Sequence, residues 1–492
     1  MTDTLTLGRW IRDRARATPD RTAIDYLGRT VTYAELDDQS ERLAGSWLDR
    51  GLEHGDRVAT LTGNSPDHVA VFFACAKAGL VLVPLSWRLA APELAYQLDD
   101  AEPALFLVEE DYDGLAAATG HPFEPLRLAA AGDPRPSPVD DRDPLLLVYT
   151  SGTTGKPKGA ILTHANCFWT NLSFDLTTGV SCDDIVLQLL PQFHCGGWNV
   201  MPLLAWWKGA TVVLERSFDP TRCLDLIAAK RVTMMMGVPA TYLFLAQEDG
   251  FATADLSSLR RAVVGGAPMP ESLLAAWQAR GIQIVQGYGL TEAAPNVLCL
   301  PPEDAGRKLG SAGKPYPHVD VALRADATGR LVDGPGAGEL VVRGPNVFAG
   351  YWNDPAASEA AFADGWLLTG DIAERDEEGF YRIVGRSKDM YISGGENVYP
   401  AEVESVLHEH PAVADAAVVG VADERWGESG VAFVVLEAGH DAGEDELLDH
   451  CRARLARYKV PRSVRFLSVL PRSGMGKVLK SDLRELERAV QA

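Results

Sequence analysis

Cysteine is scarce in this chain of 492 residues, and its seven cysteines follow no disulfide or metal-binding pattern. Their number is odd, their spacing is wide, and no Cys-x-x-Cys motif occurs. A disulfide framework and a structural zinc site are therefore disfavoured, and free thiols in a reducing compartment fit better. Cys195 lies next to His194, but most such cysteines are buried apolar residues, so we do not expect a nucleophile there.

Basic residues are also in short supply. The chain has 46 Lys and Arg against 68 Asp and Glu, which gives a formal net charge of −22 at pH 7. A chain this acidic is a poor general binder of nucleic acid or of an anionic membrane surface. Any site for an anionic ligand must therefore concentrate its basic residues locally.

Long apolar runs are missing as well. The longest, at residues 69–87, contains Lys77, Gly79 and Pro84, which predicts a helix, a turn and a strand. Residues 1–20 have no uninterrupted apolar core and no cleavage signature. We therefore expect no signal peptide, no transmembrane segment and a cytoplasmic protein.

Strand and helix patterns alternate from residue 57 to residue 286, which predicts an α/β fold with parallel sheets covered by helices. Short apolar runs predict strands at 57–62, 80–84, 184–190, 210–214, 233–236, 260–264 and 282–286. Helices are predicted at 65–78, 220–230 and 271–280. A weak internal similarity between the two halves of this region favours two parallel-sheet α/β subdomains.

From residue 309 to residue 384, glycines and turns separate short alternating runs, which predicts antiparallel strands and a small β-barrel. A compact α+β region follows, and its strongest helix, predicted at 444–456, has acidic residues in its first turn and arginines toward its end. We place the domain boundary at 387–389, so that residues 1–387 form a large N-terminal domain and residues 388–492 a small C-terminal domain.

Residues 149–159 carry the most informative pattern, Tyr-Thr-Ser-Gly-Thr-Thr-Gly-Lys-Pro-Lys-Gly, directly after a predicted strand. Glycines bring backbone N–H groups close to a ligand, hydroxyls donate to anionic oxygens, and lysines add positive charge. The pattern suits the β- and γ-phosphates of a nucleotide, although a flexible turn is the alternative. It is not a Walker A loop, because Pro157 stands where a magnesium-binding Ser or Thr should be. The candidate ligands are Thr150, Ser151, Gly152, Thr153, Thr154, Gly155 and Lys158.

A second glycine-rich segment, from Gly287 to Glu292, follows the predicted strand at 282–286. Tyr288 can stack on a purine, Thr291 can contact an α-phosphate, and Glu292 can hold magnesium. The alternative is a strand exit with a capping threonine.

Two further segments have residues that can bind a nucleoside or control access to a pocket. Asp371, in a Thr-Gly-Asp sequence, can accept hydrogen bonds from both ribose hydroxyls, and Arg386 can reach the same sugar or a phosphate. Taken alone, a Gly-Asp turn is usually local structure. His194 ends a predicted strand and can gate a pocket, while a structural histidine is the alternative.

The region after the predicted boundary adds two glycine-rich segments. Gly394 and Gly395 leave room for a ligand to pass close to the backbone, although a turn before a helix is the alternative. Lys477 lies on a second glycine-rich loop near the end of the chain. The alternative is that Lys477 is an ordinary solvated surface lysine.

Taken together, these motifs resemble the acyl-CoA synthetases of the adenylate-forming superfamily, which also contains firefly luciferase and the adenylation domains of peptide synthetases. The resemblance covers nearly the whole chain, in the family's order and spacing. It implies a two-step reaction that uses ATP, Mg²⁺ and coenzyme A. A carboxylate attacks the α-phosphate to give an acyl-adenylate and pyrophosphate, and the CoA thiol then displaces AMP.

The resemblance also implies roles for individual residues. It makes Lys477, Glu292, Thr291 and His194 catalytic, with Glu292 as the metal ligand. It makes residues 1–387 the ATP- and acyl-binding domain, and residues 388–492 a mobile domain that turns about Lys388 and lines the CoA tunnel with Gly394 and Gly395. It adds Gly265, Gly266, Ala267, Gln286, Gly287, Tyr288, Gly289, Asp371 and Arg386 to the nucleotide site.

The acyl pocket implied by the resemblance has the candidate lining residues Trp198, Met236, Gly237 and Ala293. Small residues on one side and adaptable methionines on another favour a roomy apolar pocket. A medium-chain or long-chain fatty acid, or another bulky hydrophobic acid, is the first expectation. An aryl or polycyclic acid is the alternative, and so is transfer of the acyl group to a carrier protein. The oligomeric state is open, with a homodimer as one candidate.

Overall fold

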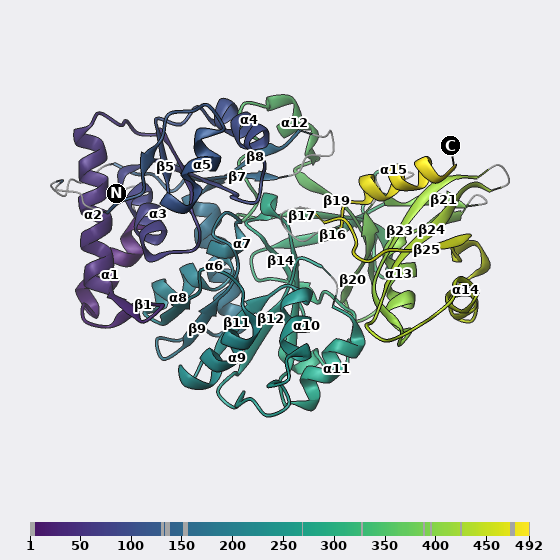
Figure 1. The fold of residues 1–492 in the computed structure, drawn as a ribbon. Coiled ribbons are helices and arrows are strands. Elements are labelled where there is room, and N and C mark those ends of the chain that lie inside the picture. The colour runs from purple at the N-terminus through teal and green to yellow at the C-terminus, as the bar shows by residue number, and fades with distance from the viewer. Residues whose placement is uncertain are drawn as a thin grey trace. The chain divides into compact units, whose positions relative to one another are not determined.

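The computed structural model describes residues 5–128, 132, 138–150, 156–267, 269–325, 328–386, 389–393, 396–423, 426–472 and 478–491. The chain forms two compact units (Figure 1). The first unit comprises Met1–Met269, Leu273–Val321 and Val342–Leu367, and the second comprises Pro270–Ser272, Ala322–Val341 and Leu368–Ala492. The domain boundary at 387–389 stays a prediction.

The first unit contains a nine-stranded sheet in the order β15-β14-β13-β12-β11-β9-β10-β1-β2. Its strands are β1 (Thr22–Tyr26), β2 (Arg29–Thr32), β9 (Ile185–Gln188), β10 (Thr211–Leu214), β11 (Met234–Gly237), β12 (Arg261–Val264), β13 (Ile284–Gly289), β14 (Asn296–Cys299) and β15 (Lys314–Pro315). The strands from β13 to β1 pair in parallel, and β14, β15 and β2 are antiparallel additions at the two edges.

A six-stranded sheet in the order β6-β5-β3-β4-β7-β8 also belongs to the first unit. Its strands are β3 (Arg57–Leu61), β4 (Val81–Leu85), β5 (Leu105–Val108), β6 (Glu124–Pro125), β7 (Pro144–Thr150) and β8 (Lys158–Thr163). All pairs are parallel except β7 with β8. The two sheets confirm the predicted pair of largely parallel α/β subdomains.

Helices follow the strands of both sheets, as Figure 1 shows. They are α1 (Gly8–Ala17), α2 (Tyr33–Asp49), α3 (Pro66–Ala78), α4 (Ala91–Ala101), α5 (Asp113–Ala117), α6 (His164–Thr178), α7 (Gly196–Asn199), α8 (Pro202–Lys208), α9 (Pro220–Ala229), α10 (Pro239–Gln247) and α11 (Glu271–Ala279). Helix α3 begins where the Ser65 side chain accepts a hydrogen bond from the His68 N–H, and it ends at Gly79 in the left-handed conformation. Within the described part of the chain, no helix is both long and apolar enough to cross a bilayer.

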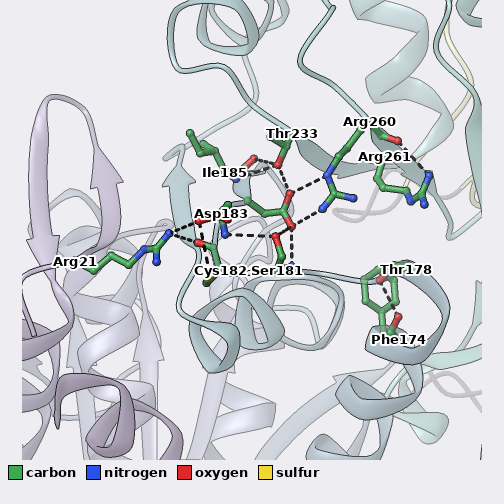
Figure 2. A network of polar contacts seen from close by, with 11 residues as sticks. Arg21, Phe174, Thr178, Ser181, Cys182, Asp183, Ile185, Thr233, Arg260 and Arg261 are labelled. Atoms are coloured by element: carbon green, nitrogen blue, oxygen red, sulfur yellow. Dashed lines mark hydrogen bonds and ion pairs between the residues drawn. The ribbon is translucent and has the colours of Figure 1, made fainter. Parts of the chain in front are cut away.

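Hydrogen bonds to a buried carboxylate join the starts of three parallel strands (Figure 2). Asp184 precedes β9, Thr233 precedes β11 and Arg260 precedes β12. The Asp184 carboxylate accepts hydrogen bonds from Arg260 at 2.5 and 3.0 Å and from the Thr233 hydroxyl at 2.6 Å. Burial alone would raise the pKa of Asp184, but the hydrogen bonds from Arg260, Thr233 and Ser181 outweigh it and lower the pKa.

The expected small β-barrel corresponds to a five-stranded sheet, in which β16-β17-β19-β18 form one path and β20 pairs with β19. Its strands are β16 (Asp320–Arg324), β17 (Gly336–Arg343), β18 (Phe362–Ala363), β19 (Trp366–Arg375) and β20 (Tyr381–Arg386), and helix α12 (Pro355–Ala360) precedes β18. The division between the two units falls within these strands.

A second five-stranded sheet, β22-β21-β24-β23 with β25 on β24, forms the core of the second unit. Its elements are β21 (Tyr391–Ser393), β22 (Glu396–Val398), α13 (Pro400–His408), β23 (Val413–Asp423), β24 (Gly427–Leu436), α14 (Glu444–Arg452), β25 (Ser463–Phe466) and α15 (Lys480–Gln491). Residues of α13 and α14 pack in one buried cluster and Leu483 of α15 in another, so helices cover both faces. Helix α14 ends at Arg452, four residues before the predicted end at 456.

Candidate active site

The predicted phosphate loop connects two antiparallel strands of the six-stranded sheet. Thr150, the last residue of β7, pairs with Lys158, the first residue of β8. The hairpin therefore places the hydroxyl of the one residue and the ammonium of the other at the same end of the sheet. Residues 151–155, which include Ser151, Gly152, Thr153, Thr154 and Gly155, lie outside the described part of the chain.

The second motif leaves the nine-stranded sheet at the end of β13. Its residues pair with β14, with Gly287 opposite Cys299 and Gly289 opposite Asn296. The backbones approach so closely that a Cβ atom at position 289 would lie 1.5 Å from the Pro295 carbonyl oxygen. Glycine is therefore required at position 289 for packing, and the turn that carries Thr291 and Glu292 follows it directly.

The two predicted nucleotide motifs meet at Glu292. Thr150 Oγ1 lies 3.4 Å from Glu292 Oε1, and the Tyr351 hydroxyl donates to the same oxygen at 2.9 Å. Burial, followed by the charge of Glu292, raises the pKa of Tyr351, so this hydroxyl stays protonated and acts as a donor.

Lys158 brings positive charge to the same place. Its ammonium lies 5.3 Å from the centre of the Tyr351 ring and 3.9 Å from Asp354 Oδ2. A cation held over an aromatic face keeps part of its charge available to an incoming anion. In the described part of the site, Tyr351 therefore contacts both the Lys158 ammonium and the Glu292 carboxylate. The Thr150 hydroxyl contacts the same carboxylate.

The predicted gate lies beside the same turn. His194 is partly exposed, and its ring centre lies 4.6 Å from that of Phe193. Cys195 Sγ donates to Thr291 Oγ1 at 3.4 Å, which places the 194–195 segment against the second motif. Burial raises the pKa of Cys195 to about 11, which agrees with its expected lack of nucleophilic character.

The other predicted nucleotide residues of the first unit lie directly after β12 and on β13. The Gly265 N–H donates to the Gly237 carbonyl at 3.3 Å, and Gly266 has a φ of +84°. Gly266 and Ala267 are exposed, whereas Gly237 is buried. The list of predicted nucleotide ligands in this unit also includes Gln286, which is 7% exposed, and Gly287, Tyr288 and Gly289, which are partly exposed.

The candidate acyl-pocket residues differ in their surroundings. Met236 is partly exposed, and its methyl carbon would lie 3.0 Å from a Cβ added at Gly265. Trp198 is fully buried, stacks on Phe72 at 4.6 Å and donates to the Gln192 carbonyl, so it is a core residue of the first unit. Ala293 is fully buried as well. Roles for these side chains in acyl binding stay predictions.

The remaining predicted residues belong to the second unit. Asp371 and Arg386 pair across β19 and β20, and Arg386 Nε lies 2.8 Å from Asp371 Oδ1. The Asp371 side chain is 6% exposed and that of Arg386 is 40% exposed. Lys388, Gly394, Gly395 and Lys477 lie outside the described residues, so their roles stay predictions.

The donor set fits magnesium held through a nucleotide. Among the described residues, no group of three or more His, Cys, Asp or Glu side chains can enclose a metal ion. Mg²⁺ commonly uses one or two carboxylates together with substrate phosphates, and not a cage of protein ligands. Glu292 supplies one such carboxylate beside the hydroxyl of Thr150.

Two residues that complete the geometry were missed by sequence reasoning. Tyr351 contacts the Glu292 carboxylate, and Asn346 donates to the Ala293 and Asn296 carbonyls at 2.9 and 3.0 Å. Both come at least fifty residues after the backbone or side chain that they contact. The Gly350-Tyr351 pair, which follows an apolar run, was the one local signal available.

Family models match most of the chain. Residues 11–352 match the model described as AMP-binding enzyme, and residues 402–477 match the AMP-binding enzyme C-terminal domain. Among curated relatives, a feruloyl-CoA synthase of Amycolatopsis is 44% identical over 97% of this chain and 98% of that protein. An indoleacetate–CoA ligase of Aromatoleum aromaticum is 43% identical, and the long-chain-fatty-acid–CoA ligase FadD13 of Mycobacterium tuberculosis is 39% identical, with coverage of 97% or more on both sides.

A solved relative shows the same fold. The o-succinylbenzoate CoA synthetase MenE of Bacillus subtilis, in complex with its acyl-adenylate intermediate, superposes with a TM-score of 0.89 at 36% identity. The match covers 96% of this chain and 97% of that one. The same enzyme has been solved with ATP and a magnesium ion.

Proposed function

This chain belongs to the family of AMP-binding enzymes, as an acyl-CoA synthetase of the adenylate-forming superfamily, and from this membership we propose that it activates an apolar aryl carboxylic acid. It is an acid–thiol ligase of the AMP-forming type. In the first step a carboxylate oxygen bonds to the α-phosphorus of ATP and pyrophosphate leaves. In the second step the CoA sulfur bonds to the acyl carbon, AMP leaves, and the thiol proton goes to solvent.

One observation supports the nucleotide-dependent part of this proposal. Thr150 and Glu292, from the two motifs predicted to hold a nucleotide, meet at 3.4 Å although they are 142 residues apart. The chemistry asks for no acid–base pair, since a carboxylic acid is already ionised at neutral pH. The site must align two anions and offset their repulsion, which hydroxyl, lysine and metal charges can do.

The chain's own residues divide this work. Lys158 and the Thr150 hydroxyl would bind phosphate oxygens, and Thr291 would contact the α-phosphate. Glu292 would hold Mg²⁺, which supplies charge neutralisation at the phosphates when it is bound. Asp371 and Arg386 would bind the ribose, since the aspartate can accept from two hydroxyls.

The names of the more similar relatives support an aryl acid as the substrate. The relatives at 44% and 43% identity are named for ferulate and indoleacetate, which both carry an aromatic ring, whereas the fatty-acid ligase is 39% identical. The methionine thioether at Met236 lies over Gly265, at a partly exposed position of β11. Methionine sulfur makes favourable contacts with aromatic rings, so it suits a wall against a flat ring.

A fatty acid is the second candidate. It is favoured by the similarity to FadD13 and by the small residues Gly237, Gly265 and Ala293 near the proposed pocket. Transfer to a carrier protein in place of free coenzyme A is a third candidate acceptor chemistry, which the names of the relatives do not favour.

Pyrophosphate exchange over a panel of acids tests the proposal. The purified protein is given Mg²⁺, ATP, labelled pyrophosphate and one acid at a time, with cinnamic and indolic acids, succinylbenzoate and fatty acids of increasing length. Each acid that supports exchange is then tested for its CoA thioester by mass spectrometry. We expect kcat/KM for the best aryl acid to exceed that for the best fatty acid by at least about tenfold, a difference of roughly 1.4 kcal/mol in transition-state binding. A higher kcat/KM for the best fatty acid would make a fatty acid the preferred substrate. No exchange with any acid would refute both candidate substrates.

A further inference from the structure

The segment at 345–351 contacts the backbone of the turn that carries Glu292. Asn346 Nδ2 donates to the carbonyls of Ala293 and Asn296, and the Phe348 N–H donates to the Glu292 carbonyl at 2.9 Å. Asn346 is fully buried. Three hydrogen bonds from one short segment therefore fix the backbone at Glu292 and directly after it.

The same segment also contacts the Glu292 side chain. The Tyr351 hydroxyl donates to Oε1 at 2.9 Å, and Thr150 Oγ1 approaches the same oxygen at 3.4 Å. Among the described residues, Oε2 has no hydrogen-bond partner. With Oε1 held by Tyr351 and approached by Thr150, Oε2 remains available to a cation.

The segment is itself firmly held. Asn166, in the first turn of α6, donates through Nδ2 to the carbonyls of Pro345 and Val347 at 2.9 and 2.8 Å. The Phe348 ring packs against that of Tyr351, with ring centres 4.9 Å apart. The start of a long helix thereby fixes the segment, and the segment fixes the turn.

We propose that Tyr351 and Asn346 are positioning residues, which orient the Glu292 carboxylate so that Oε2 meets the magnesium of bound Mg-ATP. Tyr351 sets the plane of the carboxylate, and Asn346 sets the backbone from which the side chain projects. The inference rests on the proposed function, because it assumes that Glu292 is the metal ligand. It extends that function by two residues that act through the turn carrying Glu292.

A purely structural role makes a different prediction. If the two side chains only support the fold, their loss should lower stability and leave the contribution of Mg²⁺ to ATP binding unchanged. If they position the carboxylate, their loss should reduce that contribution. The deciding quantity is the ratio of the ATP dissociation constants measured without and with Mg²⁺.

Calorimetric titration of ATP into the full chain, in Mg²⁺ and in EDTA, measures this ratio without any acid present. We expect Tyr351→Phe to reduce the ratio about tenfold, the order of one hydrogen bond to a charged group. Its ATP affinity in EDTA should stay within about twofold of that of the unmodified protein, since the ring over Lys158 is retained. Thr150, which keeps its contact with Oε1, limits the effect.

Tyr33→Phe is the matched control. Tyr33 is fully buried and its hydroxyl donates to the Ala210 carbonyl at 2.6 Å, so this variant also loses one buried hydrogen bond. It should leave the Mg²⁺ ratio unchanged. An equal ratio in Tyr351→Phe and Tyr33→Phe overturns the inference, and so does an unmodified protein that binds ATP equally well with and without Mg²⁺.

Asn346→Asp tests the second residue. The side chain keeps its shape but presents oxygen to two carbonyls, so we expect the same loss of the Mg²⁺ ratio together with a lower melting temperature. Should this variant not fold, Tyr351→Phe still decides. Failure of the inference is separable from failure of the proposed function, because pyrophosphate exchange by the unmodified protein reports on the latter alone.

Discussion

At the scale of single residues, the strongest constraint near the site is the missing side chain at position 289. Gly289 and Gly287 lie two residues apart on β13, and both belong to the predicted nucleotide motif. A Cβ at 289 would lie 1.5 Å from the Pro295 carbonyl oxygen, whereas a Cβ at 287 would meet nothing closer than 3.6 Å. Packing therefore requires glycine at position 289, whereas position 287 has room for a methyl group.

We therefore expect Gly289→Ala to lower the free energy of unfolding by about 3 kcal/mol or more, since backbone has to move to admit the methyl group. Gly287→Ala is the control in the same strand, and it should change stability by less than about 1 kcal/mol. Denaturant titration of the two variants checks this. If the Gly289→Ala and Gly287→Ala variants were equally stable, the backbone of β13 and β14 would have to move apart at little cost in free energy.

Two buried histidines contribute to the acid sensitivity of the first unit. His68 and His164 are 1% and 0% exposed, and burial lowers the pKa of each to about 4. Because the folded pKa lies below the value of about 6.5 for a free histidine, the unfolded chain takes up the proton first as the pH falls. The stability that these two neutral histidines contribute is therefore fully present above about pH 6.5 and is lost as the pH falls from 6.5 to about 4.

His164→Gln tests this acid sensitivity. The His164 ring accepts from the Leu7 N–H through Nδ1 at 3.1 Å, and a glutamine carbonyl can take that bond over. The variant should lose less stability between pH 7 and pH 5 than the unmodified protein, by about 1 to 2 kcal/mol. Thermal unfolding at both pH values measures the difference, and an unchanged acid response would contradict the assignment.

Sequence reasoning at this scale found residues that form local patterns. Thr150, Lys158 and Glu292 lie in recognisable glycine-rich segments, so their chemistry could be predicted before their meeting point was known. Asn346 and Tyr351 could not be found in this way, because their partners are brought close only by folding. A motif also placed Trp198 near the acyl pocket; its ring is fully buried against Phe72, and its role in acyl binding stays a prediction.

At the scale of elements, the buried Asp184 connects the residues that precede β9, β11 and β12. Its side chain is 1% exposed, whereas that of the partner Arg260 is 41% exposed. The neighbouring Asp183 is 87% exposed and contacts Arg21 at the surface (Figure 2). Two adjacent carboxylates thus have the same chemistry and opposite surroundings.

This contrast predicts different effects of the same substitution. Asp184→Asn should lower the free energy of unfolding by about 1.5 to 3 kcal/mol, because the buried carboxylate that accepts charge-assisted hydrogen bonds from Arg260 is replaced by a neutral amide. Asp183→Asn should lower it by less than about 1 kcal/mol, as is usual for an exposed pair. Denaturant titration compares the two variants, and similar losses would mean that Arg260 does not depend on Asp184 in the folded state.

The strands themselves were largely predictable. Apolar runs predicted β3, β4, β9, β10, β11, β12 and β13 to within three residues at each end, because strands buried on both faces need such runs. Helix α14 was predicted too long, since the arginines at 452 and 454 suit the end of a helix equally well at several positions. The barrel expected after residue 309 was harder still. Alternating runs indicate strands, but they do not say how the strands close or pair.

At the scale of the whole molecule, an acidic chain has to bring together anionic substrates. The net charge is −22, and ATP, the acid and coenzyme A are all negative. Long-range attraction therefore contributes little, and catalysis has to rely on a few cations close to the phosphates. Lys158 is one of these in the first unit, and Lys477 is proposed as another, from the C-terminal domain.

If Lys477 acts only while the carboxylate attacks the α-phosphate, its loss should separate the two half-reactions. We expect Lys477→Ala to slow adenylate formation by about 10²- to 10³-fold, the order of one lost group that stabilises transition-state charge. Thioester formation from supplied acyl-adenylate and CoA should fall by much less, because no charge then builds at the pentavalent phosphorus. Lys480→Ala is a suitable control, since its ammonium pairs with Glu404 at 2.7 Å within the second unit. Single-turnover measurements of each half-reaction give the comparison, and an equal loss in both would mean that Lys477 supports the fold or the CoA site and not the first chemical step.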